Sequence, residues 1–354
     1  MSQKLKAKQR RRKILTVFPE DISYSLEYEE GKQTKFITLD VSGGKKVECY
    51  MSCLNCVNPK CMKIGEADIK LHSFDNFSHE MNDNVCPTDA ISIQEKSICI
   101  DNNKCIGCGL CAVRCPVGAI YIKNGKASLN VAESYPNFIL EHDLNPETEK
   151  MQETLLKHLV PMHRGGIVRK ESDNVMADIY SKITNLHQDI QNLLVRNLLI
   201  TIGNQASISR LGNVYSRFDG FYENEKQKGV LEIETGTDML AVSRTILDDI
   251  AVINVRYNIS SMDNKPLAVV LSLPNKRTDY WQVIKDIKNV TNICICTLTF
   301  GALLLFTWNC EDVSDFQKFY IDVDNSSLRR FVEEELGRKV NISDGVLGVL
   351  ENSK

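Results

Sequence analysis

Apolar residues in the second half of the chain recur at two different spacings. Between Ile179 and Leu194 they recur every three or four residues, which predicts a long amphipathic helix over about residues 172–199. Further runs predict strands at 217–222 and 230–234, a helix at 238–256, a strand at 267–273 and a helix at 278–290. Strands that alternate with helices are typical of a central sheet covered on its faces, so we expect an α/β domain with a central mixed sheet.

Two other stretches are predicted to be strand pairs. The apolar stretch from Ile293 to Trp308 is interrupted at Gly301, where we expect a buried hairpin to turn. Alternating residues near 22–28 and 35–41 predict a second hairpin close to the N-terminus. No apolar run reaches the roughly 18 residues that a membrane helix needs, so no membrane contact is predicted.

Length and composition indicate more than one folded unit. The chain has 354 residues, of which 43% are hydrophobic and 25% charged, as expected for a globular protein of about two domains. Prolines and a Gly-Gly pair mark a connector in the middle of the chain. The predicted division is a basic tail at 1–13, a cysteine region at 14–125, a connector at 126–170 and the α/β domain at 171–354.

Charge is unevenly distributed along the chain. The net charge is −3, yet residues 1–13 hold seven lysines and arginines, which leaves −10 on the rest. A basic arm on an acidic body is typical of contact with nucleic acid or another polyanion, although a solvated tail has the same pattern. The apolar stretch at 14–18 is too short for a secretory signal, which predicts a cytoplasmic protein.

Cysteine carries the clearest chemistry. Thirteen are present, and in a reducing compartment clustered cysteines are expected to bind metal rather than to form disulfides. Four of them form a run of the type C-x2-C-x2-C-x3-C-P, made of Cys105, Cys108, Cys111, Cys115 and Pro116. This is the spacing of bacterial iron–sulfur ligation, in which soft thiolates bind iron. A zinc site is the alternative, but zinc sites do not usually have four cysteines within such a short run followed by proline.

A partner motif lies upstream of this run. It has the form C-x2-C-x-N-P-x-C and then C-P, and its cysteines are Cys53, Cys56, Cys61 and Cys86. The sequence Cys86-Pro-Thr-Asp-Ala-Ile is similar to Cys115-Pro-Val-Gly-Ala-Ile, which indicates an internal duplication. Gly107 and Gly109 are expected to let the second loop fold close to a cluster.

On these motifs, residues 49–125 resemble the two-cluster bacterial ferredoxins. The upstream element also resembles the electron-transfer subunits of molybdenum oxidoreductases. The resemblance implies an α+β ferredoxin-like domain with two [4Fe–4S] clusters whose ligands cross over. One cluster would take Cys53, Cys56, Cys61 and Cys115, and the other Cys86, Cys105, Cys108 and Cys111.

The chain departs from this family in two respects. The gap between Cys61 and Cys86 is 24 residues long, so residues 62–85 are expected to loop out and to shield a cluster or meet a partner. Two cysteines of this region are spare. Cys99 lies in an alternating apolar segment and is expected in the core, whereas Cys49 is an alternative ligand to Cys53.

Three acidic residues in the second half resemble a nuclease motif. Asp219 precedes one predicted strand, and Glu232 and Glu234 lie two apart on the next, where alternate residues share a face. The arrangement resembles the PD-(D/E)xK restriction-endonuclease-like superfamily over residues 172–310. The resemblance implies that these carboxylates bind Mg²⁺, which activates a water for attack on a phosphodiester. The family usually has lysine at the place of Glu234, and Lys228 or Lys276 is a candidate to supply the cation.

Simpler explanations exist for the acidic residues. Asp219 and Glu232 can equally be surface residues of a turn and an edge strand, and Asp248 and Asp249 are predicted to be exposed helix positions.

The sequence leads to two candidate functions. The sequence favours an iron–sulfur protein with a magnesium-dependent nuclease domain that acts on DNA, in defence against foreign DNA by analogy. The alternative is a cytoplasmic electron-transfer protein whose second domain docks a redox partner.

Overall fold

The computed structural model describes most of the cysteine region and of the α/β region. Described are the backbones of three early strands, and residues 53, 56, 58–94, 97–116, 118–129, 169–210, 218–236, 239–322 and 327–347. The predicted basic tail and residues 130–168 of the predicted connector lie outside the described residues. In the described part, no helix combines the length and the hydropathy that crossing a membrane requires.

The early strands form an antiparallel sheet. They are β1 (Ile22–Ser23), β2 (Lys35–Val41) and β3 (Lys45–Tyr50), in the order β1-β2-β3. The predicted hairpin is confirmed where β1 pairs with β2, and β3 is an additional strand.

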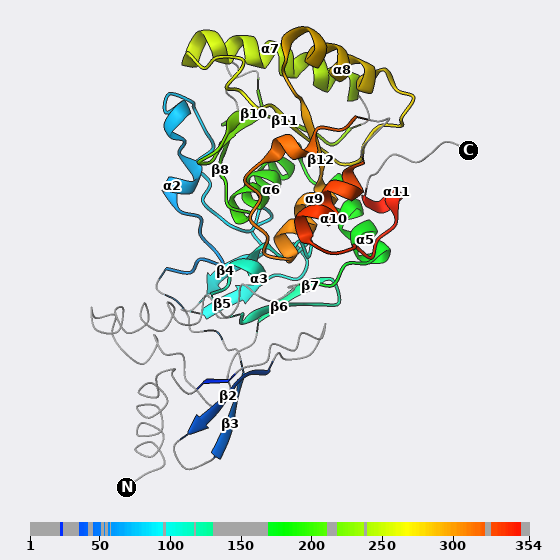
Figure 1. Ribbon diagram of the computed structural model, residues 1–354. Helices are drawn as coiled ribbons and strands as arrows, with labels where there is room; N and C mark the ends of the chain where they lie inside the picture. The colour runs from blue at the N-terminus through cyan, green and yellow to red at the C-terminus, as the bar shows by residue number, and fades with distance from the viewer. Residues whose placement is uncertain are drawn as a thin grey trace.

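The cysteine region contains two similar hairpins on either side of a short helix, α3 (Leu110–Arg114) (Figure 1). The hairpins are β4 (Ile91–Gln94) with β5 (Ser97–Ile100), and β6 (Ile120–Lys123) with β7 (Lys126–Leu129). Asp89 and Gly118 precede the two hairpins at equivalent positions and both have positive φ, 51° and 63°. The internal duplication in the sequence is therefore also a duplication in the backbone. Because β7 pairs with β6, this unit continues through Leu129.

The second region is built on a mixed five-stranded sheet with the order β12-β11-β10-β9-β8. Its strands are β8 (Gln205–Ile208), β9 (Gly220–Glu223), β10 (Lys228–Glu234), β11 (Leu267–Val270) and β12 (Cys296–Thr299). The first three are antiparallel to one another, and the last three are parallel. The predicted mixed sheet is present, with β8 as a strand that the apolar pattern did not indicate.

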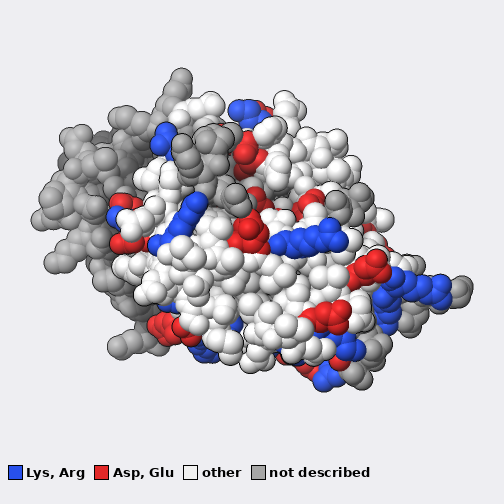
Figure 2. Space-filling view, turned by 90° about the horizontal axis from the view of Figure 1, so that it is seen from above, with Lys and Arg blue, Asp and Glu red and all other residues white. Residues whose placement is uncertain are grey.

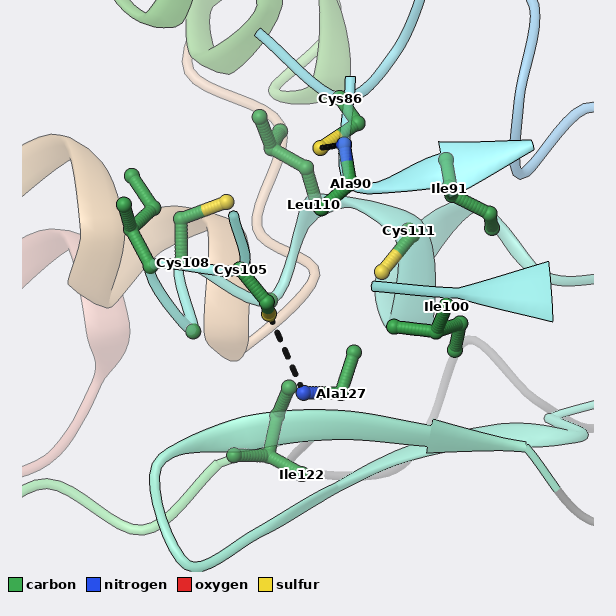
Figure 3. Close-up of a pocket in the computed structure, with 13 residues that line it drawn as sticks. Cys86, Ala90, Ile91, Ile100, Cys105, Cys108, Leu110, Cys111, Ile122 and Ala127 are labelled. Atoms are coloured by element: carbon green, nitrogen blue, oxygen red, sulfur yellow. Dashed lines mark hydrogen bonds between the residues drawn. The ribbon is translucent and has the colours of Figure 1, made fainter. Parts of the chain in front are cut away.

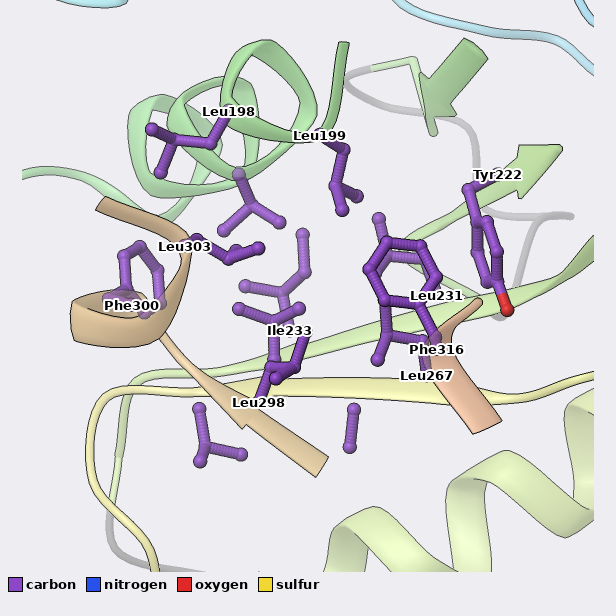
Figure 4. Packing of buried hydrophobic residues seen from close by; sticks show 14 of the residues in the cluster. Leu198, Leu199, Tyr222, Leu231, Ile233, Leu267, Leu298, Phe300, Leu303 and Phe316 are labelled. Carbon is purple, nitrogen blue, oxygen red and sulfur yellow. The ribbon is translucent and has the colours of Figure 1, made fainter. Parts of the chain in front are cut away.

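Helices cover both faces of this sheet (Figure 1). They are α5 (Asp173–Thr184), α6 (Gln188–Thr201), α7 (Met239–Tyr257), α8 (Asp279–Thr291), α9 (Phe300–Trp308), η2 (Phe316–Phe319), α10 (Leu328–Leu336) and α11 (Asp344–Leu347). Helices α7 and α8 lie side by side on one face, and α6 and α9 lie on the other. Figure 4 shows Leu198 of α6 and Leu303 of α9 packed over Leu231 and Ile233 of β10. Because side chains alternate along a strand, the even-numbered positions of β10 face α7 instead.

Two sequence predictions are wrong in this region. The predicted helix over residues 172–199 is two helices, because the chain turns at 185–187 and both Ser172 and His187 cap a helix through their side chains. The predicted hairpin from Ile293 to Trp308 is strand β12 followed by helix α9. Every residue of α9 is buried, so the segment lacks the polar face by which an amphipathic helix is recognised.

Residues 62–85 form an excursion that packs on the second sheet. It contains α2 (Glu66–Ile69) and η1 (His72–Phe74), and Phe74 stacks on Phe221 of β9 with ring centroids 3.8 Å apart. The Glu223 carboxylate accepts hydrogen bonds from the backbone N–H groups of His72 and Ser73, at 2.6 and 3.1 Å. The expected excursion therefore meets the α/β region of its own chain and shares its hydrophobic core, while the two hairpins of the cysteine region belong to a second buried cluster.

Candidate functional site

Four of the predicted ligands gather where the upstream motif meets the end of α3. They are Cys53, Cys56, Cys61 and Cys115. Burial, as the largest cause, and then the neighbouring Cys115 and Cys53 together raise the pKa of the Cys56 thiol to about 12. The pKa of Cys61 is raised by burial, then by the same neighbours and by Cys56. Cys115, which ends the second motif in the sequence, thus lies with the first motif in space.

The other four predicted ligands form a second group. Cys86, Cys105, Cys108 and Cys111 line one small pocket, together with apolar residues such as Ile91, Leu110 and Ile122 (Figure 3). The pKa of Cys108 is raised to about 12, mainly by burial and next by repulsion from the neighbouring Cys86 thiolate. Burial also raises the pKa of Cys111, and smaller contributions come from Cys108, Cys86, Cys105 and, last, Cys61 of the first group. Four of the predicted ligands thus line one pocket, while Cys115 lies near the cysteines of the upstream motif.

Backbone N–H groups point at sulfur in both groups. Ala90 donates to Cys86 Sγ at 3.3 Å, and the equivalent Ala119 donates to Cys115 Sγ at 3.2 Å. Ala127 donates to Cys105 Sγ at 3.3 Å, as Figure 3 shows. Donors of this kind stabilise a thiolate and lower its charge density, which tunes a bound iron–sulfur centre.

The donor set fits an iron–sulfur cluster. Cysteine sulfurs gather in a largely apolar environment, and soft thiolates are the ligands that a cubane takes, one on each iron atom.

The two spare cysteines of the cysteine region are on strands. Cys99 is on β5 and half-buried, and Cys49 is on β3, of which only the backbone is described. No contact of Cys99 with either group is seen among the described residues.

The predicted carboxylates are neighbours on adjacent strands. Asp219 precedes β9, and its Oδ2 accepts a hydrogen bond from the Ile233 backbone N–H at 2.8 Å. Burial raises the pKa of Asp219 to about 6, and Glu234 raises it as well. The pKa of Glu232 is raised to about 9. Burial is the largest cause, and the nearby carboxylates of Asp219, Asp249 and Glu234 are the smaller ones. These groups repel one another, although within the described residues no three of them are placed around a single ion.

Asp249 was assigned wrongly from the sequence. It is fully buried on α7, on the face that covers β10, and it joins the other carboxylates as a fourth acidic group. Asp249 lies three residues after Ile246 and four before Ile253, both of which are buried. This helical spacing places it on the inner face of α7 and could have revealed its position from the sequence. Lys228, one candidate for the missing cation, donates to Ser73 Oγ at 3.2 Å and so reaches toward η1.

Comparisons with known proteins concentrate on the cysteine region. Residues 98–121 match the family model of the 4Fe-4S binding domain. An uncharacterized ferredoxin of Methanocaldococcus jannaschii is 37% identical over 78 residues, which is 20% of this chain and 51% of that protein. The electron transport protein HydN of Escherichia coli is 43% identical over 54 residues, or 14% of this chain and 31% of HydN. The chain thus spans about half of the length of the first relative and about a third of the second.

One solved structure is similar over a larger part of the chain. The restriction endonuclease FokI bound to DNA aligns with 63% of this chain and 39% of its own, at 12% identity and a TM-score of 0.30. A TM-score of this size does not define a fold. What the family match and the sulfur geometry establish together is narrower: this chain contains a ferredoxin-type region that binds a [4Fe–4S] cluster.

Proposed function

We propose that this protein carries two [4Fe–4S] clusters and transfers electrons to or from a redox partner in the cytoplasm. The supporting observation is the division of eight cysteines into two crossed groups of four, each with N–H donors directed at sulfur. The first group would hold one cluster and the second the other. Each bound cluster supplies reversible one-electron chemistry. The names of the relatives, a ferredoxin and an electron transport protein, agree with this class of function.

A reductive titration tests this proposal. We expect anaerobically purified protein to take up about two electrons per chain reversibly, because each cubane accepts one. Cys99→Ser serves as the control, since Cys99 lies outside both groups, and it should keep the full uptake. Uptake of about one electron per chain, or none, would rule out a two-cluster carrier.

A second candidate function rests on the carboxylates. We infer that Asp219, Glu232 and Glu234 bind Mg²⁺ and that the α/β region cleaves DNA. The raised pKa values of Asp219 and Glu232 support this, because a divalent cation would relieve the repulsion among these neighbouring carboxylates. The order α6-β8-β9-β10-α7-β11 also agrees with the resemblance to the PD-(D/E)xK superfamily. On the face shown in Figure 2, basic and acidic residues are interspersed, so DNA contact there would not rest on one large basic patch.

Plasmid cleavage distinguishes the two functions. Wild-type protein with Mg²⁺ is expected to nick plasmid DNA, and Glu232→Gln should reduce the rate on the order of a hundredfold, because a lost metal ligand removes several kcal/mol of transition-state stabilisation. Glu225→Gln, in the exposed turn between β9 and β10, is the matched control and should cleave normally. Both variants should keep their iron. Uncut plasmid with wild-type protein would reject the nuclease and leave electron transfer unaffected.

A further inference from the structure

The loop that carries Cys105, Cys108 and Cys111 is attached to the α/β region by a tryptophan. Trp308, at the end of α9, is fully buried, and its Nε1–H donates to the backbone carbonyl of Cys108 at 2.7 Å. The two residues are 200 positions apart in the sequence. This bond fixes the peptide that follows one of the proposed cluster ligands.

An arginine holds the neighbouring peptide. Arg169 is 1% exposed and donates through Nη1 to the carbonyl of Gly107. Its guanidinium lies over the Trp308 ring, 5.4 Å from the centroid, which is within the range of a cation–π contact.

Helix α6 holds the segment that leads into Cys86. Arg196 is fully buried and donates to the carbonyls of Glu80, at 3.3 Å, and of Asn82. The adjacent Asn197 donates to the carbonyls of Asn84 and Val85, both at 2.9 Å. Val85 directly precedes Cys86, so α6 positions the remaining ligand of the second group.

The first group is held differently. Arg114 of α3 donates to the carbonyls of Lys60 and Lys63, at 3.1 and 3.4 Å, on either side of Cys61. That contact lies within the cysteine region itself.

We infer that the α/β region forms half of the second cluster's binding site, with Trp308, Arg169, Arg196 and Asn197 as positioning residues. The inference rests on the proposed two-cluster function. Its consequence is that the second cluster depends on the hydrogen bonds that α6 and α9 donate to its ligand loops. If one of these donors is removed, its partner carbonyl stays buried without a hydrogen bond. The loop is then held less firmly.

Trp308→Phe tests this inference, because phenylalanine keeps an aromatic ring and removes only the indole N–H. Trp281→Phe is the matched control. Trp281, on α8, is also buried, and its Nε1–H donates to the carbonyl of Pro274 at 3.3 Å. Iron release to a chelator is followed in anaerobic holoprotein. We expect half of the iron in Trp308→Phe to leave about tenfold faster than in wild type, as loss of one buried hydrogen bond implies. The other half, and all the iron of Trp281→Phe, should leave at the wild-type rate.

The outcomes separate this inference from the proposal on which it rests. Wild-type protein with about four irons would reject two clusters, whatever the variant does. About eight irons with identical release from Trp308→Phe and Trp281→Phe would overturn the positioning role alone. If Trp308→Phe does not fold, Asn197→Leu takes its place, with the same expectation of faster release for half of the iron and the same contradicting result.

Discussion

Replacing Cys115 by serine should remove one cluster and leave the Cys105–Cys111 loop with its own. We expect the iron content to fall from about eight to about four per chain. The reason is that Cys115 lies with Cys53, Cys56 and Cys61 in space, although only three residues separate it from Cys111 in the sequence. Cys111→Ser should remove the other cluster to the same extent.

Double variants make the crossing of ligands decisive. Cys53→Ser combined with Cys115→Ser should retain about four irons, because both changes affect one cluster. Cys111→Ser combined with Cys115→Ser should retain almost none, because each change empties a different cluster. Iron analysis and the absorbance of the clusters measure both. The reverse pattern, with about four irons in the second double variant, would show that the four cysteines of the downstream motif share one cluster.

Gly107→Ala should be the most damaging change that leaves every cysteine in place. Gly107 has φ of +73°, and an added Cβ would lie well inside 3.0 Å of the Gly125 carbonyl oxygen. That oxygen belongs to the backbone and cannot rotate away, so the loop must shift. We expect this overpacking to lower the free energy of unfolding by about 1–3 kcal/mol, in addition to the cost of a non-glycine residue in the left-handed conformation. We expect the variant to lose the second cluster and to retain about four irons.

Gly337→Ala separates conformational strain from crowding. Gly337 has φ of +64° at the end of α10, and nothing lies within 4 Å of an added Cβ. It should cost only the roughly 1–2 kcal/mol of a left-handed residue and keep about eight irons. Equal iron content in the two alanine variants would show that close packing around Gly107 does not support the second cluster.

The cysteine site could be predicted from sequence because its information is local. Spacing within the C-x2-C-x2-C-x3-C-P run fixes three ligands on one loop, and the repeated C-P element exposes the duplication that brings Cys86 and Cys115 into equivalent places. The mixed sheet followed in the same way from apolar runs of the lengths that strands have.

Other features depend on contacts that no local pattern contains. The α9 helix is apolar on all sides, and such a run is equally compatible with buried strands until its neighbours are known. The bond from Trp308 to Cys108 joins residues from opposite ends of the fold. The burial of Asp249 against Glu232 was accessible from helical spacing, but its acidic side chain favoured an exposed position on general grounds.

Metal analysis combined with Mössbauer spectroscopy of anaerobically purified protein tests the central claim most directly. Two crossed groups of four cysteines predict about eight irons per chain, all in the signal of [4Fe–4S] clusters, with about as much inorganic sulfide. Zinc in place of iron, or about four irons in a single cluster, would contradict the account.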